Sequence, residues 1–438
     1  MSERIDTIRS RIDDGPLSLR QIIIILIGFI LNLVDGVDVV AISVTAPEIS
    51  LSWGINSVQM GYILSAALIG MTLGALILAP MGDIYGRRRI VLIATFITGI
   101  SMIATGFVDR SLPAIIILRA ISGFGIGAIF ATAATFGSEY TPEKYKNIAV
   151  TMIISGYPFG AMIVGPIAAF IIPSQGWEML FIYAGFSTLL ICTLVYTLLP
   201  ESIQFIENSD IADDEKLVAI NKALQNINRD PIDRLEPRIS KQTSEQTRVG
   251  KLLSRDLKMT TLKLWVIFFM GFLTIYFLLT WVPLMFVNSG YSMTEGIFAL
   301  TLNNLGAMVG TVTIGLLGTK YKLSVPIAVY FFATALFMIY VMLARPSDLI
   351  ILYVLIFIIG TFVNGAFSAM YAAAARLYHS VVRSTGIGWC AGLGRTGAIL
   401  APIIAGYLIT LGFGMYALFA VFAVPVLIAA ILIITIKV

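Results

Sequence analysis

Twelve long apolar segments dominate this chain. The first, from Gln21 to Pro47, is long enough to cross a bilayer, because a helix rises about 1.5 Å per residue and the hydrocarbon core is about 30 Å thick. Of all residues 58% are hydrophobic and 12% are charged, whereas soluble proteins carry about 25% charged residues. The sequence therefore predicts an all-α membrane protein. The predicted spans are 21–47, 57–80, 89–108, 112–138, 147–173, 177–199, 261–288, 294–318, 323–343, 348–376, 384–410 and 413–436.

Two acidic residues interrupt the first span. Asn32, Asp35 and Asp38 are three residues apart, so they project from one face of a helix. A carboxylate inside a membrane is costly and normally faces a polar cavity or a partner. We interpret Asp35 and Asp38 as a proton-coupling site. The alternative is an ion pair that holds the helices together.

The basic residues predict the orientation of the chain. If the N-terminus is inside, the loops on the opposite side hold only two basic residues, Arg110 and Arg345, and the other basic loop residues lie on the cytoplasmic side. This asymmetry satisfies the positive-inside rule. We therefore expect a multi-pass protein of the cell inner membrane with both termini in the cytoplasm.

A polar stretch divides the spans six and six. We expect an N-terminal six-helix bundle at 1–199, a cytoplasmic linker at 200–260 and a C-terminal six-helix bundle at 261–438. Within the linker, apolar residues from Leu217 to Ile227 recur at helical spacing and predict a short amphipathic helix, either on the membrane surface or against the bundle. A solvated linker is the alternative for 229–246.

The two halves resemble each other in sequence. At one constant offset Gly156 aligns with Gly392 and Pro166 with Pro402. Two parallel six-helix repeats are typical of a transporter whose halves rock about a site near the middle of the membrane.

Several motifs carry a family resemblance. The loop APMGDIYGRRRIVL at Ala79–Leu92 resembles the signature loop of the major facilitator superfamily. DGVD at Asp35–Asp38, LPES at Leu199–Ser202 and RSTGIGWCAGLGRTGAILAP at Arg383–Pro402 resemble the aromatic acid:proton symporter family within it. The resemblance implies two pseudo-symmetric six-helix bundles in the major facilitator fold, and it implies that both acids of DGVD are essential for uptake.

Two arginines lie within predicted spans. Arg119 falls at the depth of Asp38, and we expect it to pair with one of the two acids. Arg395 lies about twelve residues into its span, near the midplane, with no acid close by in the same segment. Its planar guanidinium matches a carboxylate two bonds at a time, so we expect it to bind an anionic substrate. Hydrogen bonds to helix carbonyls or to a distant Asp are the alternative. The predicted substrate-binding residues are Arg395, Arg119, Asn32, Asn303, Asn304, Tyr276, Phe367 and Tyr371.

The signature loop supplies the predicted gate. Asp83 is expected beside the cytoplasmic start of the eleventh span, where a helix N-terminus favours negative charge. The corresponding residue in the second half is Thr319, so the mirrored acid is missing. The alternative is that the arginines serve only to orient the chain. The predicted gating residues are Asp83, Gly86, Arg87, Arg88 and Glu139.

The function that we predict is proton-coupled uptake of a small organic anion, an aromatic carboxylate such as a hydroxybenzoate. The chain has no catalytic constellation and no phosphate-binding loop, so we expect neither an enzyme nor ATP-driven transport. The alternatives are a proton-driven exporter of drugs or metabolites, an importer of a non-aromatic carboxylate such as a muconate-like or sugar acid, and a receptor that binds a metabolite without moving it. We expect no cofactor, no metal and no nucleic acid, and a functional monomer in the bilayer.

Overall fold

The computed structural model describes residues 8–13, 15–209, 211–235, 250, 252–379 and 382–436. Within these residues, twelve helices are long and apolar enough to cross a membrane, as predicted. They are α2 (Leu19–Trp53), α3 (Ser57–Leu73, continued by the π-helix Gly74–Leu78), α5 (Arg87–Thr105), α6 (Leu112–Tyr140), α7 (Glu143–Gln175), α8 (Trp177–Leu198), α12 (Lys258–Asn288), α13 (Met293–Lys320), α14 (Ser324–Ala344), α15 (Leu349–Leu377), α16 (Arg383–Thr410) and α17 (Met415–Ile434).

The first spanning helix is longer than predicted at both ends. Ser18 and Gln21 form a capping box that begins α2, and Gly54 ends it in the left-handed conformation, with φ of 66°. The helix continues through Pro47, because neighbouring helices in a membrane bundle can satisfy the backbone groups that a proline frees.

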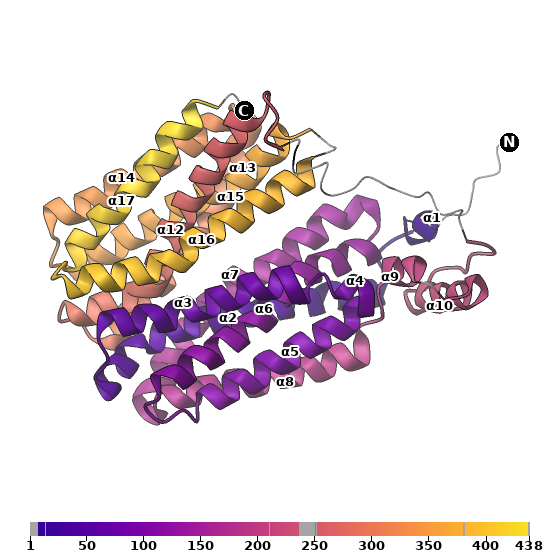
Figure 1. Ribbon diagram of the computed structural model, residues 1–438, viewed down its shortest axis with the longest axis horizontal. Coiled ribbons are helices and arrows are strands. Elements are labelled where there is room, and N and C mark those ends of the chain that lie inside the picture. Colours follow the sequence, from indigo (N-terminus) through magenta and orange to yellow (C-terminus); the bar gives the residue numbers. More distant parts are fainter. Residues whose placement is uncertain are drawn as a thin grey trace.

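The spanning helices pair in the same way in both halves. In the first half α2 packs on α7, α3 on α6 and α5 on α8. In the second half the corresponding pairs are α12 with α16, α13 with α15 and α14 with α17. Figure 1 shows the two resulting bundles, one indigo to magenta and the other red to yellow. The internal sequence repeat is therefore also a repeat of helix packing.

The halves meet through α3 with α16, α7 with α13 and α2 with α12. Ser65 Oγ of α3 donates to the carbonyl of Ile399 on α16 at 2.8 Å, and the hydroxyls of Tyr62 and Tyr407 are 2.9 Å apart. These residues lie near the start of α3 and toward the end of α16. They therefore belong to the end of the bundle opposite to the one where α2 begins and α17 ends. We call the end where these residues join the halves the far end, and the end where α2 begins and α17 ends the terminal end.

Short helices cover the terminal end of the first half (Figure 1): α1 (Ile8–Asp13), α4 (Gly82–Tyr85), α9 (Ile203–Asn208) and α10 (Asp213–Asn226). The predicted amphipathic helix is α10, which packs on α9, and its residues Ile220 and Leu224 are fully buried in an apolar cluster. The chain beyond α10 folds back on it, because Asn221 exchanges two hydrogen bonds with the backbone of Ile232. The rest of the predicted solvated segment, 236–246, lies outside the described residues.

Candidate functional site

Asn32, Asp35 and Asp38, which the helical spacing predicted to share one face of α2, are all buried. Asn32 is 1% exposed, and Asp35 and Asp38 are 0% exposed. Gly36 allows α2 to approach α7 closely, because a Cβ at this position would lie 2.7 Å from the backbone nitrogen of Ala161. Close packing of α2 on α7 therefore holds the two acids in a fixed setting.

Asp38 is neutralised by an arginine. Arg119 Nη2 donates to Asp38 Oδ1 at 2.6 Å, and Ser122 Oγ donates to the same oxygen at 2.9 Å. The guanidinium also lies over the ring of Phe181, with its carbon 4.9 Å from the ring centroid. Both charged side chains are completely buried. The predicted pairing of Arg119 with one of the acids is confirmed, and it takes place inside the first half.

Asp35 has different surroundings. Neither of its carboxylate oxygens has a hydrogen-bond partner among the described residues. Its electrostatic neighbours are Asp38 on its own helix, Tyr157 on α7 and Arg395 on α16. Of the two acids, Asp38 is therefore bound within its own half, and Asp35 interacts with a cation of the other half.

Arg395 is a cation without a counter-ion in direct contact. It forms no ion pair with any residue that the structure describes. Its guanidinium carbon lies 5.9 Å from the ring centroid of Phe130 on α6 of the other half, and its side chain is only partly buried. A partly exposed guanidinium in this setting is suited to binding a carboxylate from solution.

An aromatic cluster beside Arg395 consists of five rings of the second half, those of Phe268, Phe272, Tyr276, Phe367 and Tyr371. Phe272 lies 4.5 Å from Phe367 and 5.8 Å from Tyr276, measured between ring centroids. Tyr371 lies 5.1 Å from Phe268 in an edge-to-face arrangement. Tyr276 and Tyr371 both interact electrostatically with Arg395. The structure thus brings together four of the predicted substrate-binding residues, which are Tyr276, Phe367, Tyr371 and Arg395.

Known proteins share this arrangement of spans. A family model described as Major Facilitator Superfamily matches residues 28–347 and 264–437. The chain belongs to the Major Facilitator Superfamily. It is 32% identical to the 4-hydroxybenzoate transporter PcaK of Pseudomonas putida, over 97% of this chain and 94% of that protein. It is 28% identical to the gallate transporter of Pseudomonas putida, over 97% of this chain and 93% of that protein.

A solved structure confirms the fold of this superfamily member. The crystal structure of the D-xylose-proton symporter superposes with a TM-score of 0.74 at 17% identity, covering 94% of this chain and 97% of that chain. The predicted fold class and the predicted kinship with aromatic acid transporters of the superfamily are confirmed by these likenesses. The relatives are transporters, so the chain is a multi-pass membrane transporter of this superfamily and not an enzyme.

The superfamily signature loop forms a polar network at the terminal end. Arg87 pairs with Glu139 at the end of α6 and with Asp83 at 2.9 Å, and Ser202 Oγ donates to Glu139 Oε2 at 2.6 Å. The backbone nitrogen of Arg88 donates to Glu201 Oε1 at 3.0 Å. The network therefore joins the signature loop to the LPES turn within the first half.

Asp83 is not where the sequence led us to expect it. Its side chain is 69% exposed and pairs with Arg87, and among the described residues it makes no hydrogen bond or ion pair with α16. The halves touch at the far end in this conformation, so the start of α16 is free to stand away from the signature loop. Contact of Asp83 with α16 requires the terminal ends of the two halves to come together, so it stays a prediction for another conformation.

The predicted asparagines lie at helix contacts. Asn304 Nδ2 donates to the carbonyl of Ala161 on α7 at 3.2 Å, which joins the two halves. Asn32 Nδ2 donates to the carbonyl of Gly28 on its own helix at 3.0 Å. Asn303 is buried, and its Nδ2 has no partner among the described residues. No interaction in the described chain connects these three with Arg395.

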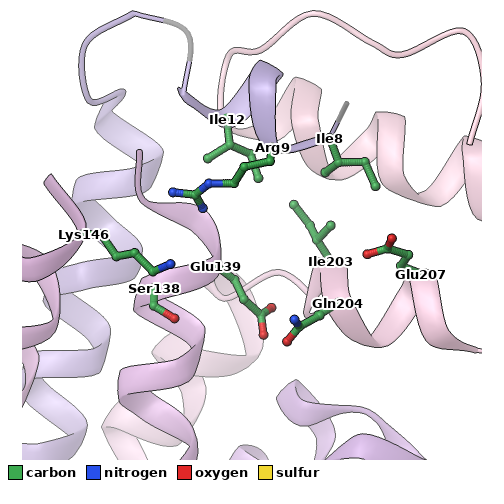
Figure 2. Close-up of a pocket in the computed structure, with 9 residues that line it drawn as sticks. All are labelled: Ile8, Arg9, Ile12, Ser138, Glu139, Lys146, Ile203, Gln204 and Glu207. Atoms are coloured by element: carbon green, nitrogen blue, oxygen red, sulfur yellow. The ribbon is translucent and has the colours of Figure 1, made fainter. Parts of the chain in front are cut away.

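A separate cavity of about 380 Å³ opens at the terminal end, between α1, α6, α7 and α9. Figure 2 shows Arg9 of α1 pointing toward Lys146, with Glu139 and Gln204 near each other on the opposite side. Arg87 donates to both Glu139 and Gln204, so this cavity adjoins the polar network of the signature loop and not the cluster around Arg395. It is lined by Ile8, Arg9, Ile12, Ser138, Glu139, Lys146, Ile203, Gln204 and Glu207.

Sequence reasoning missed several residues of both regions. Phe268 and Phe272 were missed although the sequence carries a signal for them. They precede the predicted Tyr276 at intervals of four residues, so all three lie on one helix face. The LPES turn was used as a family marker, although Glu201 and Ser202 are hydrogen-bonded parts of the polar network of the signature loop. No sequence signal singled out Tyr157 or Phe130, because their proximity to Arg395 arises between the two halves.

Proposed function

We propose that this chain takes up a small aromatic carboxylate together with a proton, by alternating access between its halves. The observation that carries the proposal is an arginine without a bound counter-ion beside an aromatic cluster, opposite a buried and unpartnered carboxyl group. The residues concerned are Arg395, the aromatic cluster and Asp35.

The substrate class follows from the groups around Arg395. The guanidinium offers two parallel N–H donors to one carboxylate, and the aromatic cluster offers ring edges and faces worth about 0.5–1.5 kcal/mol for each aromatic pair. Relatives at 28–32% identity are named for 4-hydroxybenzoate and gallate, which unite a ring with a carboxylate. A non-aromatic acid would use Arg395 and leave the aromatic cluster without a matching surface.

The proton site that we propose is Asp35. An ionised carboxylate that receives no hydrogen bond is much costlier to bury than a neutral carboxyl group. Arg395 offsets part of that cost, and a substrate carboxylate at Arg395 would remove the attraction. Substrate binding therefore favours proton uptake on Asp35. Because a proton and a monoanion together carry no net charge, the pH gradient drives accumulation and the electrical term cancels.

We place both termini in the cytoplasm and the chain in the cell inner membrane, on the distribution of loop arginines and lysines. The far end, where the halves touch, then faces outward, and the structure corresponds to a state open toward the cytoplasm. One chain supplies both halves of the site, so we propose that the monomer is the functional unit.

Transport by the purified protein in lipid vesicles tests the proposal. With an imposed inward proton gradient we expect labelled 4-hydroxybenzoate to accumulate, and a protonophore to abolish accumulation. Net movement outward against the substrate gradient would indicate a proton-driven exporter, and binding without flux would indicate a receptor. Competition by muconate or a sugar acid, but not by benzoates, would overturn the aromatic assignment.

A further inference from the structure

Arg119 and Arg395 each lie over a phenylalanine ring. The guanidinium carbon of Arg119 is 4.9 Å from the ring centroid of Phe181, and that of Arg395 is 5.9 Å from the ring centroid of Phe130. Such a contact uses the charge and the flat face of the guanidinium, and it leaves the N–H donors, which point outward in the plane, free for other partners. The two sites differ in what these donors bind.

Arg119 shows the complete arrangement. With its guanidinium over Phe181, its Nη2 donates to Asp38 Oδ1 at 2.6 Å, so that a ring and a carboxylate share one guanidinium. Arg395 has the ring of Phe130 but forms no ion pair with any carboxylate of the described residues. The comparison indicates where a ligand carboxylate fits at Arg395, which is at the edge of the guanidinium with the ring on its face.

Phe130 is fixed by the packing of α6 within the first half. Gly123 and Gly127 pack directly on the backbone of α3, and the ion pair of Arg119 with Asp38 holds α6 against α2. Phe130 follows Arg119 by eleven residues, which is about three helical turns, so both side chains leave the same side of α6. The ring therefore stands on a helix whose rotation is set by its own half.

Arg395 lies on the face of α16 that turns toward the first half. Ile399, one turn further along this face, accepts a hydrogen bond from Ser65 Oγ of α3 at 2.8 Å. One turn in the other direction, toward the terminal end, Gly392 has nothing within 4 Å of an added Cβ, and Gly388 beyond it is equally open. Space for a ligand is therefore present beside the guanidinium on its terminal side.

We propose that Phe130 is a positioning residue, which holds the guanidinium of Arg395 from the opposite half so that its donors meet the carboxylate of an aromatic acid. This inference rests on the proposed function and adds a residue of the first half to the anion site. A ring suits this role because it attracts the charge without accepting any of the five N–H bonds. An acidic side chain in its place would occupy these donors, as Asp38 does at Arg119, and would compete with the substrate.

Equilibrium binding to the purified full chain tests the inference with two probes. One is 4-hydroxybenzoate, and the other is 4-hydroxybenzamide, which has the same ring and hydroxyl but no negative charge. The variants are Phe130→Leu, which removes the ring, and Phe130→Tyr, which keeps it. Phe130→Leu is also combined with Arg395→Met. The matched control is Phe124→Leu, since Phe124 is a partly buried phenylalanine of the same helix that packs within the first half.

Phe130→Leu should weaken the binding of 4-hydroxybenzoate about two- to fivefold, which is the usual contribution of a cation–ring contact at exposed sites. It should leave the binding of 4-hydroxybenzamide unchanged. Phe130→Tyr and Phe124→Leu should keep the wild-type affinity for both probes. In the Arg395→Met background Phe130→Leu should cause no further loss, because the ring then has no charge to hold. If Phe130→Leu does not fold, Phe130→Met, which also fills the space without a ring, decides the question.

Wild-type affinity of Phe130→Leu for 4-hydroxybenzoate would overturn the inference and leave the proposed function intact. Equal losses for the two probes, or a further loss in the Arg395→Met background, would also overturn it, because Phe130 would then contact the substrate without positioning the arginine. A wild type that binds the benzamide as tightly as the benzoate would instead count against the anion site of the proposed function. These outcomes separate the two proposals.

Discussion

Asp38 and Arg119 form an ion pair of 2.6 Å in which both side chains are completely buried, and Ser122 completes it with a hydrogen bond of 2.9 Å. Removing one charge of a buried pair leaves the other without compensation, which typically costs about 3–5 kcal/mol. We therefore expect Arg119→Met to lower the free energy of unfolding by that amount, as measured by chemical denaturation of the purified protein.

The double variant Asp38→Asn/Arg119→Met is the informative comparison. It removes both charges, so it should recover most of the stability that Arg119→Met loses. Ser122→Ala removes one hydrogen bond to the pair and should cost about 1 kcal/mol. An Arg119→Met protein as stable as the wild type would show that the pair does not hold the first half together.

Asp35→Asn should abolish proton-driven accumulation and leave the stability of the protein nearly unchanged. Because neither oxygen of Asp35 receives a hydrogen bond, the amide loses no partner, and the free energy of unfolding should stay within about 1 kcal/mol of the wild type. Accumulation driven by a pH gradient should disappear, whereas exchange of labelled for unlabelled 4-hydroxybenzoate should continue. Undiminished accumulation by this variant would remove Asp35 from the proton site.

Arg395→Met should impair binding without destabilising the protein. The guanidinium has no ion pair in the described chain, and a charged hydrogen bond to substrate contributes about 1.5–3 kcal/mol, which corresponds to a loss in affinity of about 10- to 150-fold. Arg376→Met is the matched control, since it removes the same charge from an exposed position at the end of α15. Equal affinities in the two variants would contradict the assignment of Arg395.

The twelve spans could be predicted because a membrane helix must be apolar over its whole length. The ends were harder to place. Pro47 appeared to end the first span, but α2 continues six residues further to Trp53, since bundle contacts tolerate a proline there. The shared face of Asn32, Asp35 and Asp38 was also predictable, because it follows from helical spacing alone.

Contacts between helices were predictable only in part. The depth of Arg119 indicated a pair with Asp35 or Asp38, but the choice depends on the rotation of α6, which also brings Ser122 onto Asp38. The placement of Asp83 depends on the conformation of the whole molecule, and the sequence carries no record of which conformation is adopted. Arg395 meets Phe130 across the two halves, so neither half alone indicated this contact.

Gly86 lies in the signature loop and packs against Glu201 of the LPES turn. Its φ of 100° is strained for any residue with a side chain, and a Cβ would lie 2.6 Å from Glu201 Oε2. Gly86→Ala should therefore displace Glu201 from the backbone of Arg88 and lower the free energy of unfolding by about 2 kcal/mol. Thermal and chemical denaturation of the purified variant would measure the loss.

Gly315→Ala is the matched control for this substitution. Gly315 lies within α13 with nothing inside 4 Å of an added Cβ, so alanine there should leave the protein unchanged or stabilise it by about 0.4–1 kcal/mol through the unfolded chain. The two glycines thus differ in backbone conformation and in surroundings, while the chemical change is identical. If both variants unfolded alike, the link between the signature loop and Glu201 would contribute nothing to the stability of the first half.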